Sequence, residues 1–177
     1  LAEAHEALVR TSADPFRVTI ERILSPTEAI VNGSRMILAG TNNYLGLTFD
    51  PECLDAAARA VYEQGTGTTG SRMANGSFNG HAALEHELAD FYVRRWCVVF
   101  STGYLANLGV ISALTGQEDV ILIDADCHAS IYDGCRMSGA EVIRFHHNDP
   151  GDLHKRLRRL GERRTNTLII LEGTYSM

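Results

Sequence analysis

The stretch Val120–Ser130 reads VILIDADCHAS and decides the fold class of this chain. Four consecutive aliphatic residues are followed by two aspartates, a histidine and the small residues of a helix start. An unbroken apolar run of this length indicates a strand buried on both faces, as in a parallel sheet that helices cover. Ligands of such sheets bind beyond the carboxyl ends of the strands, so the polar residues of this stretch are candidates for chemistry.

The rest of the C-terminal half repeats the alternation of strand and helix patterns. Strands are predicted at Cys97–Phe100, Val120–Asp124, Glu141–His146 and Thr167–Glu172. The segments between them, Tyr104–Leu114, Ser130–Met137 and Asp152–Leu160, are predicted to be helices. Strands that alternate with helices favour an α/β fold with a mostly parallel sheet.

The N-terminal half is built from different signals. Asp50 and Pro51 are an N-cap and a first-turn proline, and Gly65 is a C-terminal stop, so they predict a helix between them. A second helix is predicted from His81 to Arg95. The segment between the two helices, Gly65–Arg72, reads GTGTTGSR, which can approach an anion with its backbone N–H groups but is more often a flexible connector.

Residues 1–40 are predicted to form an N-terminal arm, separate from a larger domain over residues 41–177. The arm is expected to hold a short helix, Ala2–Arg10, and a hairpin that turns at Asn32 and Gly33.

Composition excludes several classes of protein. The 177 residues are 45% hydrophobic and carry a formal net charge of −6, which disfavours nucleic-acid binding through phosphate neutralisation. Apolar runs such as Leu168–Leu171 are far shorter than the roughly 20 residues of a membrane-spanning helix, so no membrane span is expected. The four cysteines form no C-x-x-C pair, and we expect reduced thiols in a cytoplasmic protein.

One candidate site is the turn Phe100–Tyr104, which reads FSTGY. A strand ends there and a helix begins, so unpaired backbone N–H groups and the positive end of the helix dipole suit a phosphate. The ring of Tyr104 could flank a planar ligand. Equally, Ser101 or Thr102 could be an ordinary N-cap, and Tyr104 a packing residue.

The second candidate site is Asp124–Ser130, after the central strand. Two carboxylates and an imidazole at a strand end can hold a divalent metal, supply a nucleophile with an acid, or place His128 against a ring. The spacing does not choose among these, and His128 could be an ordinary helix-start residue. A zinc site built from Cys127, Cys135, His146 and His147 matches no common ligand spacing.

Five segments, in order, resemble the α-oxoamine synthases, which are pyridoxal-phosphate enzymes of the aspartate-aminotransferase fold (fold type I). They are Thr41–Leu47, Gly65–Arg72, Asn75–His81, Phe100–Tyr104 and Asp124–Ile131. The resemblance covers nearly all of residues 38–177 and implies that the chain is the N-terminal part of the large, cofactor-binding domain. Its collinearity is more specific than any single motif.

The family condenses an amino acid with an acyl-CoA and releases carbon dioxide. FSTGY and the run from Asp124 to Gly134 are most similar to the bacterial members that join L-serine to palmitoyl-CoA. The resemblance therefore implies pyridoxal 5'-phosphate as cofactor and 3-ketodihydrosphingosine, the first product of sphingolipid biosynthesis, as product. It also implies a homodimer with shared active sites, in which Gly67–Arg72 could reach a neighbour's cofactor.

By the same resemblance, seven residues receive roles. The cofactor would be bound by Ser101, Thr102, Gly103, Tyr104 and His128, with His128 stacked on the pyridine ring as the catalytic residue. Asn43 and Ser71 would contact the substrate. No metal ligand is implied.

The family's Schiff-base lysine and the aspartate of the pyridine nitrogen lie beyond a segment like Leu171–Met177, so we expect this chain to be truncated and inactive alone. Lys155 is the one lysine and lies in no motif. Three alternatives stay open: a sister enzyme that uses glycine or alanine with another acyl-CoA, a non-catalytic subunit of the same fold, and an Asp-x-Asp metal-dependent transferase using Asp124 and Asp126.

Overall fold

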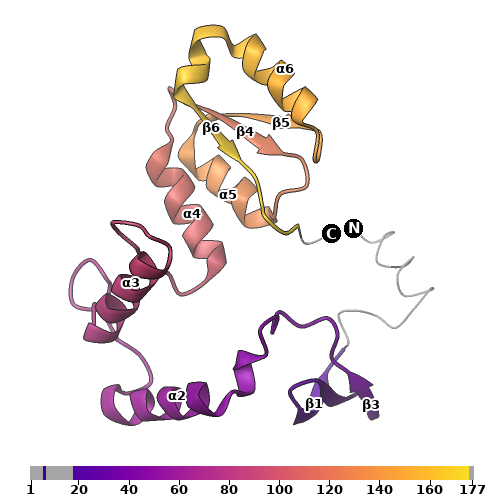
Figure 1. Ribbon diagram of the computed structural model, residues 1–177, viewed down its shortest axis with the longest axis vertical. Helices are drawn as coiled ribbons and strands as arrows, with labels where there is room; N and C mark the ends of the chain where they lie inside the picture. The colour runs from indigo at the N-terminus through magenta and orange to yellow at the C-terminus, as the bar shows by residue number, and fades with distance from the viewer. Residues whose placement is uncertain (1–5, 7–17, 176–177) are drawn as a thin grey trace. The chain divides into compact units, whose positions relative to one another are not determined.

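The computed structural model describes residue 6 and residues 18–175, and these divide into two compact units between Ser77 and Phe78 (Figure 1). Each unit is described by itself. The boundary expected after residue 40 falls inside the first unit and stays a prediction. Apart from Glu6, the predicted helix Ala2–Arg10 lies outside the described residues.

The first unit holds a small antiparallel sheet in the order β1-β2-β3: β1 (Ile20–Ser25), β2 (Glu28–Val31) and β3 (Ser34–Ile37). The predicted hairpin at Asn32 and Gly33 is confirmed, since both residues have positive φ, 48° and 77°. A two-residue turn with this backbone matches the twist of the strands that it joins.

A short 3-10 helix, η2 (Leu47–Phe49), leads to α2 (Pro51–Gln64), which has the predicted caps. The Asp50 carboxylate accepts hydrogen bonds from the N–H groups of Glu52 and Cys53 at 3.0 and 3.2 Å. Gly65 ends the helix with a φ of 83°. After α2 the glycine-rich loop folds back on itself, because a Cβ at Gly76 would lie 2.0 Å from the Gly70 carbonyl oxygen.

The second unit is the α/β part. Its parallel sheet has the order β5-β4-β6, with β4 (Val120–Asp124) in the centre between β5 (Glu141–Phe145) and β6 (Thr167–Ile170). The helices are α3 (Asn79–Phe91), α4 (Gly103–Leu114), α5 (Ala129–Ser138) and α6 (Pro150–Leu160), and the 3-10 helix η3 (Gly161–Asn166) follows α6. The three strands and three helices expected after residue 103 are confirmed to within two residues at each end.

Two predictions for this unit are wrong in detail. Residues 97–100 form no strand, because no described residue pairs with them in a ladder, and the Val99 N–H instead donates to Glu85 at 2.9 Å. The helix expected to reach Arg95 ends at Phe91. Val93 there adopts a φ of 52° and the Arg94 N–H bonds the carbonyl of Ala89 at 2.8 Å, a left-handed helix ending usually made by glycine.

The order of the strands sets which helix covers which face. The crossover through α5 joins β4 to β5, and the crossover through α6 then passes back over β4 to β6. Because such crossovers are right-handed, the two helices lie on opposite faces of the sheet, as Figure 1 shows.

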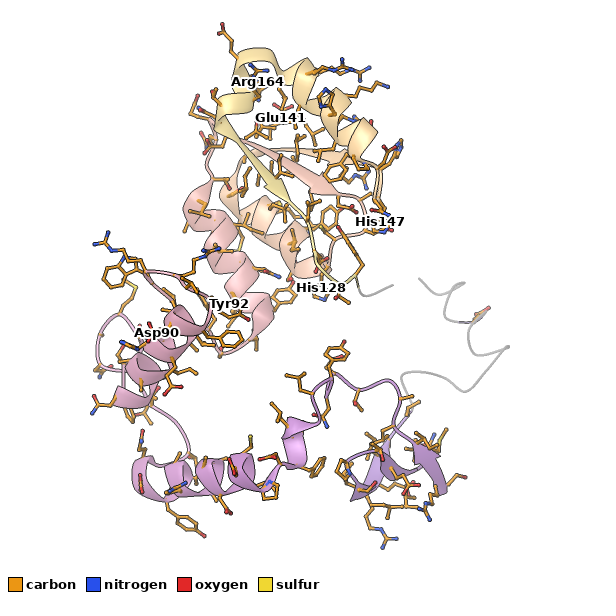
Figure 2. The ribbon with its side chains drawn as sticks, in the orientation of Figure 1. Asp90, Tyr92, His128, Glu141, His147 and Arg164 are labelled. Atoms are coloured by element: carbon orange, nitrogen blue, oxygen red, sulfur yellow. The ribbon has the colours of Figure 1, made fainter. Side chains whose placement is uncertain are left out.

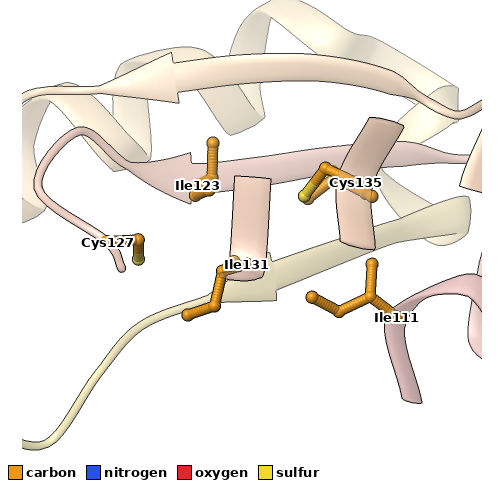
Figure 3. Packing of buried hydrophobic residues seen from close by; sticks show 6 residues of the cluster. Ile111, Ile123, Cys127, Ile131 and Cys135 are labelled. Atoms are coloured by element: carbon orange, nitrogen blue, oxygen red, sulfur yellow. The ribbon is translucent and has the colours of Figure 1, made fainter. Parts of the chain in front are cut away.

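The core lies on the α4–α5 face of β4. Its buried members are Ile111, Ile121, Ile123, Cys127, Ile131 and Cys135, of which five are labelled in Figure 3. Helix α5 packs closely on α4 at Gly134, where a Cβ would lie 3.0 Å from the Asn107 carbonyl oxygen. This packing holds the starts of α4 and α5 in a defined relation within the unit.

Candidate active site

The candidate site lies at the carboxyl edge of the parallel sheet. The connections after β4 and β5 leave toward opposite faces there, which is where open α/β sheets form their ligand crevices. Figure 2 labels His128 after β4 and His147 after β5, both beyond the strand ends.

Asp124, the last residue of β4, accepts hydrogen bonds from the loops that follow β4 and β5. The residue is buried, with 1% of its surface exposed. Its Oδ1 accepts hydrogen bonds from the Asp126 N–H at 3.0 Å and from His147 Nδ1 at 2.9 Å, and its Oδ2 accepts from the Asn148 N–H at 3.1 Å. Burial alone would raise the pKa of Asp124, but these hydrogen bonds and one from Tyr175 outweigh it and lower that pKa. Asp124 is therefore an ionised anchor for the loops.

His147 is the hydrogen-bond partner of this anchor across the sheet edge. The hydrogen bond to Asp124 raises the pKa of His147, the charge of Asp126 adds to the rise, and partial burial opposes it. The His147 ring also meets the Tyr175 ring edge-on, with centroids 4.5 Å apart. Asp124, His147 and Tyr175 thus connect the carboxyl ends of all three strands.

A raised pKa for His147 predicts how stability depends on pH. The protonated ring stabilises the fold fully below the unfolded pKa of about 6.5, and this contribution is lost as the pH rises through the higher folded pKa. We expect the melting temperature difference between wild type and His147→Gln to be largest near pH 5.5 and to shrink by pH 9. The exposed His154 on α6 serves as control, and a difference that grew with pH would contradict the assignment.

His128 is the N-cap of α5, and both its backbone and its side chain are hydrogen-bonded. Its backbone N–H donates to Glu172 Oε2 at 2.6 Å. Its Nδ1 accepts from the Ser130 N–H at 3.2 Å and lies 2.8 Å from Ser130 Oγ, which accepts in turn from Asn107 Nδ2 at 2.9 Å. Because Nδ1 is the acceptor, the neutral ring carries its proton on Nε2.

The start of α4 provides the predicted anion-type site. Thr102 is the N-cap, and its hydroxyl accepts from the Leu105 N–H at 3.1 Å. The N–H groups of Gly103 and Tyr104, in the first turn, bond no acceptor among the described residues. Gly103 faces open space, since a Cβ there would meet nothing within 4 Å. Two free donors and the helix dipole therefore point to where an anion can approach.

Tyr104, in the first turn of α4, contacts residues at the start of α5 and within it. Its ring meets the His128 ring edge-on at a centroid distance of 6.3 Å, and its hydroxyl donates to Asp133 on α5. Five of the predicted site residues, Ser101, Thr102, Gly103, Tyr104 and His128, thus belong to one edge of the second unit. Their roles toward a cofactor stay predictions.

The other two predicted residues belong to the first unit. The Asn43 side chain accepts hydrogen bonds from the N–H and the hydroxyl of Thr48, at 3.2 and 2.8 Å. The Ser71 hydroxyl accepts from the Met73 N–H at 3.2 Å. These contacts account for local turns, and the expected substrate contacts of both residues stay predictions.

Sequence reasoning missed three residues that shape the site: Asn107, Asp133 and Glu172. Glu172 had a signal, because it is the last residue of a predicted strand, as Asp124 is, and ligands bind at the carboxyl ends of such strands. The contacts of Asn107 and Asp133 had no signal in the sequence, since their partners lie 23 and 29 residues away.

The geometry gives no support to a metal site. Cys127 and Cys135 are buried in the core, and burial raises the pKa of the Cys127 thiol to about 12. The Asp126 side chain is 55% exposed, whereas that of Asp124 is 2% exposed. Across residues 18–175, His, Cys, Asp and Glu side chains form no group of three that could hold a metal ion.

Comparison with known families then decides the affiliation. The family model for aminotransferases of class I and II matches residues 34–177. The chain belongs to this family. It is 58% identical over 99% of its length to the serine palmitoyltransferase of Caulobacter vibrioides, of which it covers 43%.

Solved structures agree with this affiliation. The serine palmitoyltransferase of Sphingomonas wittichii matches 99% of this chain with 51% identity and a TM-score of 0.91, and the chain covers 44% of it. The S. paucimobilis enzyme with bound PLP–myriocin aldimine matches with 49% identity and a TM-score of 0.92, again over 99% of this chain and 44% of that one. The fold expected from the resemblance is confirmed.

A relative with a second activity also matches: the 8-amino-7-oxononanoate synthase of Lysinibacillus sphaericus is 42% identical over 85% of this chain, which covers 39% of it. The chain therefore spans less than half the length of the relatives that it matches. In the part of the chain that the structure describes, every helix is too short or too polar to cross a bilayer.

Proposed function

We propose that the protein containing this chain is a pyridoxal-phosphate-dependent acyltransferase that condenses L-serine with a long-chain acyl-CoA, such as palmitoyl-CoA, and releases carbon dioxide. The product would be 3-ketodihydrosphingosine. The observation that carries the proposal is the pairing of two free N–H donors at the start of α4 with the His128 ring at the start of α5, in a chain 58% identical to a serine palmitoyltransferase.

The residues present fit the cofactor. The N–H groups of Gly103 and Tyr104, with the hydroxyl of Ser101 close in sequence, suit a phosphate dianion, and Thr102 shapes the turn as its N-cap. The imidazole of His128 suits the face of an aromatic ring. When bound, pyridoxal phosphate supplies the electron sink that stabilises a carbanion at the amino acid Cα.

The chain's own residues would orient this chemistry. Ser130 and Asn107 fix the rotation of the His128 ring, and Glu172 fixes its backbone, so the imidazole presents one face and its Nε2 proton. A ring held in this way limits how a bound amino acid can turn. Orientation of the bond to be broken is the contribution expected of such a residue.

The substrate choice is tested with a panel. We expect the full-length protein to release CoA fastest with L-serine and palmitoyl-CoA, and at least about tenfold more slowly with glycine, with L-alanine or with short acyl-CoAs, because each missing contact costs about a factor of ten in rate. Thiol release and mass spectrometry of the ketone measure this. Preference for glycine or L-alanine with a shorter acyl-CoA would instead assign a sister activity of the α-oxoamine synthases.

We further propose a homodimer in the cytoplasm. The hydroxyl-rich loop Gly67–Arg72 is the candidate to reach a neighbouring subunit's cofactor, as in symmetric enzymes with shared sites. The four cysteines are unpaired and two of them are buried, which favours a reducing compartment. Sedimentation of the active full-length protein as a monomer would contradict the dimer.

A further inference from the structure

Asp133 on α5 connects the two parts of the candidate cofactor site, the start of α4 and the start of α5. One carboxylate oxygen, Oδ2, accepts the hydrogen bond of the Tyr104 hydroxyl from α4. The other, Oδ1, pairs with Arg136 one turn further along α5. Both oxygens are thus occupied, and Arg136 balances a negative charge that would otherwise lie bare beside an anion-type helix start.

This contact uses the only proton that the Tyr104 hydroxyl can donate. The phenol donates its one proton to Asp133, and the same hydrogen bond raises the pKa of Tyr104, so the hydroxyl stays protonated at neutral pH. A committed hydroxyl cannot also donate to a phosphate oxygen. What Tyr104 still offers to a ligand is its backbone N–H and its ring.

The hydrogen bond to Asp133 also fixes the orientation of the Tyr104 ring. Tyr104 is 41% exposed, so packing alone leaves its side chain room to turn. Held at its hydroxyl by Asp133, the ring stands at 83° to the His128 ring, with centroids 6.3 Å apart. Tyr104 therefore fixes the distance and the angle between its own ring, at the start of α4, and the imidazole at the start of α5.

We propose that Asp133 is a positioning residue for pyridoxal phosphate: it holds the ring of Tyr104 against His128, so that Tyr104 serves the cofactor through its backbone and ring and not through its hydroxyl. This inference rests on the proposed function and names residues for the cofactor site. Asp133 acts only through Tyr104 and needs no contact with the cofactor.

A double-mutant cycle on the full-length apoprotein tests the proposal, with the dissociation constant of pyridoxal phosphate read from quenching of intrinsic fluorescence. Asp133→Ala and Tyr104→Phe each remove one partner, and each is expected to weaken binding about tenfold. Because both break the same contact, the double variant should bind no more weakly than either single variant. Asp133→Asn keeps an acceptor oxygen and should restore most of the affinity.

Asp90→Ala is the matched control, since Asp90 pairs with His86 one turn away on the exposed α3 and should leave the dissociation constant unchanged. Melting temperatures of the apoproteins show whether the variants are folded. Unchanged affinity in Asp133→Ala, or single effects that multiply in the double variant, would overturn this inference alone. Failure of the wild-type protein to bind pyridoxal phosphate would overturn the proposed function instead.

Discussion

Replacing His128 with alanine is expected to lower the rate of condensation by the full-length protein about 100-fold or more, the usual size of orientation and proton-transfer contributions. The anion site at the start of α4 does not involve the imidazole, so cofactor binding should survive. Abortive transamination should rise relative to condensation, because the substrate is no longer held in one orientation. Initial rates of CoA release and of keto-acid formation measure both effects.

Two further variants separate the ring of His128 from its role as a helix cap. His128→Asn keeps a side-chain acceptor for the Ser130 N–H but has no aromatic ring, so it should be stable and nearly inactive. His128→Phe keeps a ring but loses the cap, and should recover part of the selectivity at some cost in stability. Full activity in His128→Ala with normal cofactor absorbance would reduce His128 to an ordinary helix-start residue.

Replacing Asp124 with alanine is expected to cause the largest loss of stability among single substitutions at the site, about 3 kcal/mol or more. The variant removes a carboxylate that belongs to a residue only 1% exposed, and it leaves the N–H groups of Asp126 and Asn148 and the ring of His147 without their acceptor. Chemical denaturation of the full-length protein at pH 7 measures the loss.

Asp126→Ala is the control for this prediction, because the exposed Asp126 carboxylate makes only a 3.8 Å approach to His147 and should contribute less than about 0.5 kcal/mol. Since the pKa of Asp124 is lowered, its contribution is present above the unfolded value of about 3.9 and is lost as the pH falls through the folded pKa. Equal losses in the two variants would contradict the role of Asp124 as an anchor.

The sequence was informative where structure depends on neighbours in the chain. The caps of α2 follow from Asp50, Pro51 and Gly65, because a cap bonds groups two or three residues away. The strand β4 follows from its unbroken apolar run, and the hairpin turn from Asn32 and Gly33. Signals of this kind act within one turn of helix or one strand, so no tertiary contact is needed to find them.

Residues 97–100 mark the limit of that reasoning. Their composition suits a strand, but a strand exists only when a neighbour completes its hydrogen-bond ladder, and no described residue does so. The early end of α3 has a similar cause, since Val93 takes a left-handed conformation that its β-branched side chain disfavours. In neither place does the local preference of the residues decide the structure.

For the site, the sequence by itself determined which turns could bind a ligand: FSTGY at the start of α4 and DADCHAS after β4, each a strand end or helix start rich in polar groups. Only the tertiary structure decided how those turns are held. Asp124 faces inward onto four donors, Glu172 holds the backbone of His128, and Asp133 holds Tyr104. Apart from the bond to the Asp126 N–H, these contacts join residues 23 to 51 positions apart along the chain, which the crossovers of the parallel sheet bring to one edge. The direction of a side chain at that edge depends on which partner the fold supplies, and no local pattern encodes that partner.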